Sequence, residues 1–181
     1  MCDACDRGIS SDNPVQYQQW IDQQDTEIRE AIRQRGWYWA GVEGDDATSR
    51  PPFAYTIGLT GVDHPELVVF GLHHEISHKV LRGLANRVLS GERFDEDTDL
   101  ELPIWTTHLH VLRVRMLTCP RPEDVLLWAV DTYAPEVLVA AVQVVWSDSN
   151  DRFPWEPGYE FAAWMQPMPG TFSARLPGPA A

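Results

Sequence analysis

The sequence has little lysine and few basic residues overall. It contains a single lysine, Lys79, and 14 lysine and arginine residues against 27 aspartate and glutamate residues, so its net charge is −13. Proteins that bind nucleic acids need a basic surface that displaces counterions from phosphates, and anionic membranes attract basic segments in a similar way. We therefore expect neither nucleic acid nor a membrane surface among the partners of this chain.

Long apolar runs and a leader-like start are also missing. The longest apolar run, residues 137–146, is far shorter than the roughly 18 residues that suggest a membrane-spanning helix. Residues 1–10 contain no apolar stretch typical of a signal peptide. The three cysteines are an odd number, which does not suit a disulfide framework. These absences predict a cytoplasmic protein with reduced thiols.

The 181 residues have the length of one domain. A helix is predicted from Asn13-Pro14, a capping residue followed by proline, to Gly36, which suits a helix end. The other expected elements are strands at 37–43, 53–59, 67–72, 105–117 and 137–146, a helix that Gly91 ends, an acidic loop at 92–103, and a short helix from Pro122 to about Tyr133.

This order of elements predicts a single α+β domain over residues 1–172, in which about three helices pack against a mixed or mostly antiparallel sheet. A Cys-x-x-Cys segment at 1–12 begins the domain. Residues 173–181 are expected to be a loose C-terminal tail.

His74, Glu75 and His78 form an H-E-x-x-H sequence. In zinc peptidases, two histidines one helical turn apart bind the metal, and the glutamate activates the bound water. Here the sequence lies at the very start of a predicted helix, and no third ligand follows at a recognisable spacing. A zinc-dependent hydrolase with Glu75 as its catalytic residue is therefore an alternative to the leading hypothesis. The same two histidines are metal-ligand candidates of lower rank.

Cys2 and Cys5 have the spacing of half a zinc site or of a redox pair. A redox pair usually opens a helix after a strand, whereas these cysteines precede the first predicted helix. A zinc site needs two further ligands, and His108 and His110 share one face of a predicted strand. Zinc is thus the one cofactor that the sequence suggests, with incidental free cysteines as the alternative.

Polar side chains collect at the ends of the apolar strands. They lie in the turn at 64–66 and in the segment at 148–152, which follows the most apolar strand. A few polar groups beside apolar strands are typical of a ligand pocket, although structural turns are the alternative interpretation. The candidate ligand-binding residues are Tyr55, His64, Glu66, Trp146, Asp148, Arg152 and Trp155.

A series of short motifs runs through the chain. They are Cys2-Asp-Ala-Cys5-Asp6, Arg35-Gly36-Trp37, Pro52-Phe-Ala-Tyr-Thr-Ile-Gly-Leu59, His64-Pro-Glu-Leu67, Gly71-Leu72, Gly91-Glu-Arg, Gln143-Val-Val-Trp146-x-Asp148, Arg152-Phe-Pro-Trp155-x-Pro-Gly158 and Gln166-Pro167. In this order they resemble the bacterial domain-of-unknown-function 4262 family, over about residues 2–170. The resemblance implies no particular activity. It makes the motif segments better site candidates, and the H-E-x-x-H sequence is not part of its pattern.

The leading hypothesis is a binding domain for a small molecule or a metal ion. One alternative is the zinc-dependent hydrolase. The other is a protein-interaction module without chemistry, which would use the eight tryptophans and the acidic loop to contact a partner.

Overall fold

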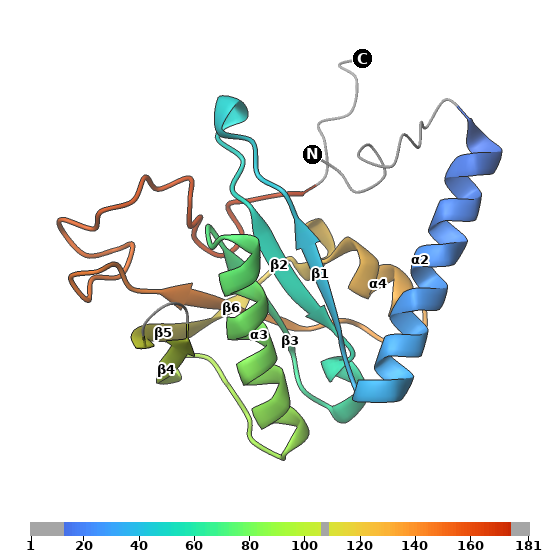
Figure 1. The fold of residues 1–181 in the computed structure, drawn as a ribbon, viewed down its shortest axis with the longest axis horizontal. Helices are drawn as coiled ribbons and strands as arrows, with labels where there is room; N and C mark the ends of the chain where they lie inside the picture. Colours follow the sequence, from blue (N-terminus) through green and yellow to red (C-terminus); the bar gives the residue numbers. More distant parts are fainter. Residues whose placement is uncertain (1–12, 106–108, 175–181) are drawn as a thin grey trace.

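The computed structural model describes residues 13–105 and 109–174. Within these residues the helices are α2 (Pro14–Arg35), α3 (His74–Leu89) and α4 (Leu127–Tyr133), and the strands are β1 (Tyr38–Val42), β2 (Phe53–Ile57), β3 (Glu66–Phe70), β4 (Asp99–Trp105), β5 (Leu109–Cys119) and β6 (Ala141–Trp146). The six strands form one sheet in the order β1-β2-β3-β6-β5-β4 (Figure 1). Neighbouring strands are antiparallel except β3 and β6, which are parallel. The predicted α+β class with a mixed sheet is confirmed.

The first helix, α2, has the ends that local sequence predicts. The Asn13 side chain accepts the backbone N–H of Gln16 at 3.2 Å, and Pro14 takes the first helical position, where no N–H is needed. Gly36 ends the helix at φ 86°, a left-handed conformation that glycine adopts without strain. None of the described helices combines the length and the apolar character needed to cross a membrane.

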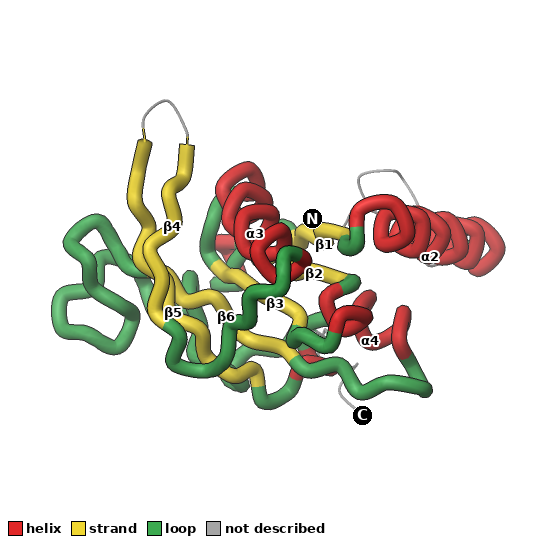
Figure 2. The backbone as a smooth tube through the Cα atoms, turned by 90° about the horizontal axis from the view of Figure 1, so that it is seen from below, coloured by secondary structure: helices red, strands yellow, loops and turns green. Residues whose placement is uncertain are grey.

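Side chains alternate along the strands and divide the core into two layers. Figure 2 shows α3 on one side of the sheet and α4 on the other, with α2 beside β1. The α3 layer includes Leu67, Val69, Leu81, Leu84, Val144 and Trp146. The opposite layer includes Ile28, Tyr55, Val68, Phe70, Leu126 and Ala129. Successive residues of β3 therefore enter different layers, as the two-residue period of a strand requires.

Residues 99–105 form an edge strand, β4, although the sequence predicts an acidic loop at 92–103. Leu102 and Ile104 are buried in the α3 layer, and the strand pairs antiparallel with β5. The exposed residues that alternate with them, Glu101 and Pro103, are of types common in loops. Acidic residues and proline are also typical of edge strands, because they discourage further pairing, so the loop prediction is wrong here.

Two other predicted elements are shorter in the structure. The last strand begins at Ala141, since Leu138 is 96% exposed and residues 137–140 join no sheet. The helix predicted to begin at Pro122 begins at Leu127, after a single 3-10 turn at Pro122–Asp124. The apolar residues at 137–140 suggest a longer strand, and Pro122 suggests an earlier helix start. In neither segment does tertiary packing extend the element that far.

Candidate functional site

The carboxyl ends of the two parallel strands, β3 and β6, lie side by side at one end of the sheet. The indole Nε1–H of Trp146, the last residue of β6, donates to the carbonyl oxygen of Phe70, the last residue of β3, at 2.8 Å. From these ends β3 leads into α3, and β6 leads into the long loop after residue 146 (Figure 1). In sheets with parallel strands, ligands often bind in a crevice beyond the carboxyl ends of two neighbouring strands whose following segments run in different directions.

An apolar groove of about 310 Å³ lies at these strand ends, between α3, the β4–β5 hairpin and the loop after β6. It is lined by Leu72, Ile76, Ile104, Val111, Leu112, Trp146, Ser147, Asp148, Ser149, Glu160 and Phe161. Small-molecule sites span about 300–1,000 Å³, so the groove is large enough for a small ligand. None of the described residues that line it is a lysine or an arginine.

An aromatic group forms one wall of the groove. The rings of Trp146 and Phe161 meet edge to face, with centroids 5.0 Å apart, and Tyr159 lies 5.7 Å from Phe161. Gln166 fixes this wall, because its side chain bonds both the N–H and the carbonyl of Trp146 and donates to the Tyr159 hydroxyl. Sequence reasoning assigned Gln166 no role, although the Gln166-Pro167 motif in the family resemblance was a signal.

Asp148 organises the loop that borders the groove. Its carboxylate accepts the backbone N–H groups of Asn150 and Arg152 at 2.9 Å and that of Glu160 at 3.0 Å. Burial opposes ionisation of this residue, which is 6% exposed, but the three N–H donors and the positive charge of Arg152 outweigh it and hold its pKa below the ordinary value. Asp148 is therefore a fixed negative charge beside the aromatic wall.

The structure does not bring the seven predicted ligand-binding residues together. Tyr55 lies in the layer of α2 and α4, where its hydroxyl accepts the backbone N–H of Trp128 at 3.2 Å and burial raises its pKa. Trp146 lies in the opposite layer. The predicted convergence of Tyr55 with the segment after Trp146 does not occur, because the sheet lies between them.

Arg152 and Trp155 also lie apart from the groove. Arg152 donates to the Gly158 carbonyl at 2.8 Å. Trp155 stacks on Phe153 at 4.9 Å, with the Arg115 guanidinium 5.6 Å from its ring. Arg115 alternates with residues of β5 that enter the α3 layer, so this stack covers the other face of the sheet.

Glu66 holds a turn rather than a ligand. Its side chain is fully buried, and Oε1 accepts three hydrogen bonds at 2.9 Å, from the Gly58 N–H and from both the N–H and the hydroxyl of Thr60. Oε2 accepts the Thr56 hydroxyl at 2.6 Å. Burial raises the pKa of Glu66 despite these donors. The carboxylate thus ties the 3-10 turn Leu59–Val62 to the start of β3.

His64 has both ring nitrogens engaged inside the fold. Nε2 accepts the backbone N–H of Phe94 at 3.0 Å, so Nδ1 carries the proton and donates to the Pro65 carbonyl at 2.7 Å. Burial lowers its pKa, and the residue is 4% exposed. His64 therefore joins the turn before β3 to the segment after α3, and has no nitrogen left for a ligand.

The H-E-x-x-H residues are arranged around an indole. His74 and His78 approach the Trp39 ring edge-on, with centroids 4.3 and 5.5 Å away. Glu75 forms an ion pair with Lys79 at 2.7 Å on the exposed side of α3. Among the residues that the structure describes, no three histidine, cysteine, aspartate or glutamate side chains are placed to hold a metal ion. This geometry gives the hydrolase alternative no support.

The side-chain positions of the other predicted metal ligands are not described by the structure. Cys2, Cys5 and His108 lie outside the described residues, as does the side chain of His110. Their assignment as a zinc site stays a prediction from the sequence.

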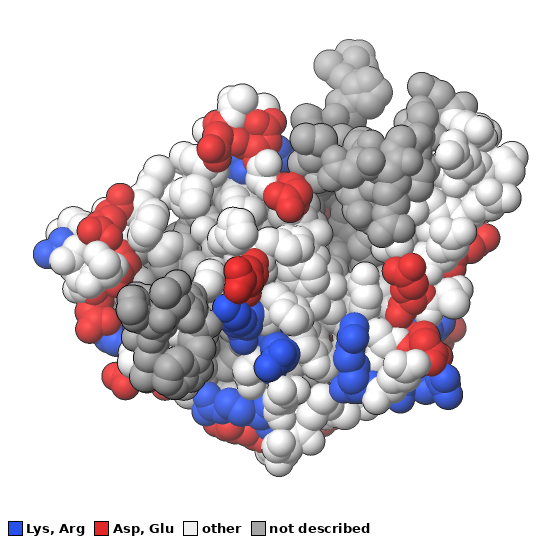
Figure 3. Space-filling model, viewed as in Figure 1, with Lys and Arg blue, Asp and Glu red and all other residues white. Residues whose placement is uncertain are grey.

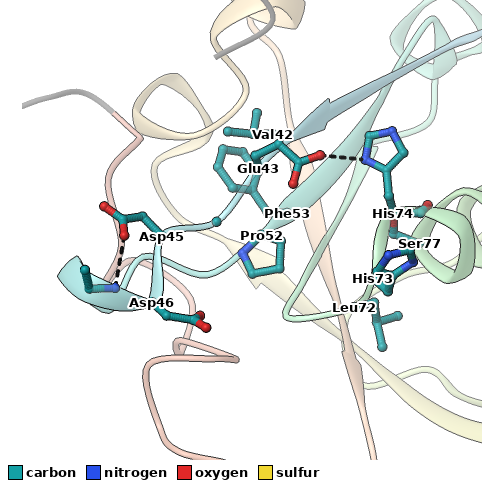
Figure 4. A pocket seen from close by; sticks show the side chains of 12 residues that line it. Val42, Glu43, Asp45, Asp46, Pro52, Phe53, Leu72, His73, His74 and Ser77 are labelled. Carbon is teal, nitrogen blue, oxygen red and sulfur yellow. Dashed lines mark hydrogen bonds and ion pairs between the residues drawn. The ribbon is translucent and has the colours of Figure 1, made fainter. Parts of the chain in front are cut away.

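A second, more polar hollow of about 410 Å³ shares Leu72 with the groove (Figure 4). Glu43, Asp46 and His74 are among its lining residues. Glu43 Oε1 lies 3.6 Å from His74 Nδ1, and both side chains are more than half exposed, which makes the pair weak. Figure 3 shows acidic side chains at the tip of the β1–β2 connection, above this hollow, and basic ones lower, over α3 and the C-terminal end of α2. The apolar groove is the better candidate site, because its walls are more apolar.

Comparison with known proteins gives a family without an activity. A family model described as a domain of unknown function (DUF4262) matches residues 31–160. No curated protein and no solved structure matches the chain. The matched range covers well over half of the 181 residues and includes the groove walls from Leu72 to Glu160. The chain therefore belongs to the DUF4262 family.

Proposed function

We propose that this protein binds a small molecule, and that the ligand places an apolar group in the groove at the carboxyl ends of β3 and β6. The observation that carries the proposal is the groove itself, with walls formed by Ile76, Leu112 and Phe161 from three different elements. The Trp146 indole N–H is already bonded to Phe70, so an apolar occupant leaves no donor of this ring unsatisfied. Filling such a groove removes apolar surface of both partners from water.

The size of the groove sets the expected affinity. A fragment of about ten non-hydrogen atoms, each contributing about 0.4 kcal/mol, binds with a Kd of about 1 mM. Larger natural ligands that extend beyond the groove would bind more tightly. Detection of a fragment therefore requires a method suited to weak binding, such as saturation-transfer NMR.

The remaining assignments rest on composition. We infer a cytoplasmic protein, because the odd cysteine count does not suit a disulfide framework. The net charge of −13 favours a small-molecule partner over nucleic acid or an anionic membrane. Metal binding rests on the Cys2 and Cys5 spacing with candidate ligands such as His108 and His110. The interaction-module alternative rests on exposed aromatic residues such as Trp155, which is 41% exposed.

2-Phenylethanol, a neutral compound with one aromatic ring, tests the proposal. We expect the wild-type protein to bind it with a Kd of about 1 mM. Val111→Trp places an indole at the groove, at a position that is 59% exposed, and is expected to weaken binding at least about fivefold. Val62→Trp is the matched control, since Val62 is 49% exposed and lies outside the groove. Undetectable binding to the wild type, or equal binding by both variants, would contradict the proposal.

A further inference from the structure

We propose that the groove selects ligands that carry a positively charged head group, such as an ammonium group joined to a small apolar body. This inference rests on the proposed function and adds to it the charge of the ligand. Three observations support it: the carboxylates at one end of the groove, the direction of the nearby arginines, and the aromatic wall.

Two carboxylates, Asp148 and Glu160, border the groove, and neither forms an ion pair with a described lysine or arginine. Asp148 accepts only backbone N–H groups. Glu160 accepts the Ser149 hydroxyl at 2.8 Å and the Asn150 side-chain amide at 3.1 Å. All these donors are neutral groups, and they hold the two carboxylates in place. The positive charge of Arg152 contributes to the lowered pKa of Asp148 without forming an ion pair with it, whereas no ion pair joins Glu160 to a described lysine or arginine. A cationic ligand group would pair with Glu160 at the end of an otherwise apolar groove.

The arginines of the surrounding segments direct their side chains elsewhere. Arg152 donates to the Gly158 carbonyl. Arg113 donates to the Asp151 carbonyl at 3.2 Å, and its guanidinium lies 5.2 Å from the Phe153 ring. Neither arginine lines the groove. Neither arginine forms an ion pair with the two carboxylates, and an anionic ligand would find no basic side chain in the described walls.

The aromatic wall favours the same charge. Aromatic faces attract ammonium groups within about 6 Å of the ring centre. Phe161 is 40% exposed. It follows Glu160 directly in the sequence, and its ring packs against the Trp146 ring. Because the two rings pack against each other, a cation would lie over the open face of Phe161 rather than inside a closed cage. The apolar body of the ligand would then extend toward Ile76 and Leu112.

The neighbouring polar hollow does not change this preference. Its described lining contains Glu43, Asp45 and Asp46 and, like that of the groove, no lysine or arginine. A ligand that extended past Leu72 would meet further negative charge.

Three probes with the same aromatic ring separate the charge from the apolar contact: 2-phenylethylamine as its ammonium ion, neutral 2-phenylethanol, and phenylacetate. At low ionic strength we expect the amine to bind about tenfold more tightly than the alcohol, and phenylacetate to bind most weakly. Glu160→Gln keeps an oxygen for hydrogen bonding and is expected to reduce the preference for the amine to about threefold. Glu136→Gln, which also removes one exposed carboxylate but lies outside the groove, is expected to leave the preference unchanged.

The outcomes distinguish this inference from the proposed function. A preference for the amine that Glu160→Gln reduces and Glu136→Gln does not supports charge selection. Equal binding of amine and alcohol, or tightest binding of phenylacetate, overturns charge selection and leaves the groove as an apolar site. If none of the three probes binds, both proposals fail. An amine preference that Glu160→Gln does not reduce also overturns the inference, because the charge then acts elsewhere.

Discussion

The indole N–H of Trp146 and the carbonyl oxygen of Phe70 are joined by a hydrogen bond of 2.8 Å. The bond connects the carboxyl ends of the two parallel strands, and both residues are buried, at 5% and 2% exposure. A buried tryptophan needs a partner for its N–H, and here that partner belongs to the other strand. The groove wall is therefore part of the core of the sheet, and ligand binding should not require it to form first.

Replacing this tryptophan tests how far the wall supports the fold. Trp146→Phe leaves the Phe70 carbonyl without its partner and leaves a cavity, so we expect the free energy of unfolding to fall by about 2–4 kcal/mol. Guanidinium denaturation measures the change. Trp155→Phe, at a position 41% exposed, is the control and should change stability by less than about 0.5 kcal/mol. Similar losses in both variants would show that Trp146 has no special structural role.

Glu66 should be essential as an acceptor but not as a charge. Glu66→Ala leaves the donors of Thr56, Gly58 and Thr60 without their acceptor and should lower the free energy of unfolding by about 3 kcal/mol. Glu66→Gln retains one oxygen for Gly58 and Thr60, and its amide group can donate to the Thr56 hydroxyl. We expect this variant to stay within about 1 kcal/mol of the wild type in urea denaturation at neutral pH. Equal losses in the two variants would contradict this assignment.

The raised pKa of Glu66 also predicts a pH dependence of stability. Burial makes the folded state hold this proton more firmly than the unfolded state, whose carboxyl has the ordinary pKa of 4.5. The stabilisation is complete below that value and is lost as the pH rises through the folded-state pKa. We expect the difference in unfolding free energy between Glu66→Gln and wild type to grow in favour of the variant from about pH 4 to about pH 7. A difference that does not vary with pH would argue against this titration.

His64 predicts the opposite dependence. Burial lowers its pKa, so the neutral ring stabilises the folded state above the ordinary value of 6.5, and this contribution is lost as the pH falls below it. His64→Ala should remove that pH dependence and expose the Phe94 amide, whose hydrogen exchange should accelerate at least about tenfold. His73→Ala, at an exposed residue, is the control. Unchanged exchange at Phe94 would show that the ring does not hold this segment.

Elemental analysis of protein purified without a histidine tag tests the zinc prediction. The cysteine hypothesis predicts zinc in the wild type, loss of zinc in Cys2→Ser/Cys5→Ser, and retention in His74→Ala/His78→Ala. Loss with the histidine variant alone would instead favour the hydrolase alternative, and Glu75→Gln would then be expected to keep zinc and lose hydrolysis. Protein without zinc would remove both ideas.

Features fixed by neighbouring residues could be predicted from the sequence. The ends of α2 follow from Asn13, Pro14 and Gly36, because caps act within a few residues. The edge strand β4 could not be predicted with the same method, since Glu101 and Pro103 give it the composition of a loop while its pairing with β5 supplies the structure. The predicted last strand begins too early, at residue 137, because apolar residues such as Leu138 need not be buried.

The candidate site could be predicted only in part. Trp146 and Asp148 line the groove, and they lie at the end of an apolar strand and just after it. Tyr55 could not be excluded from the sequence, because a period of two separates the faces of a strand without showing which face lies under which helix. His64 and Glu66 were polar residues at strand ends, but their partners, Phe94 and Thr56, are set by tertiary packing.

The central claim is that the groove binds a ligand, and amide chemical shifts of the labelled wild-type protein test it most directly. On titration with 2-phenylethanol, we predict that the largest shift changes occur at the amides of Leu72, Ile76, Leu112 and Phe161 and at the Trp146 indole N–H. Shift changes centred on the polar hollow at residues 43–47, or no saturable changes at all, would contradict the account.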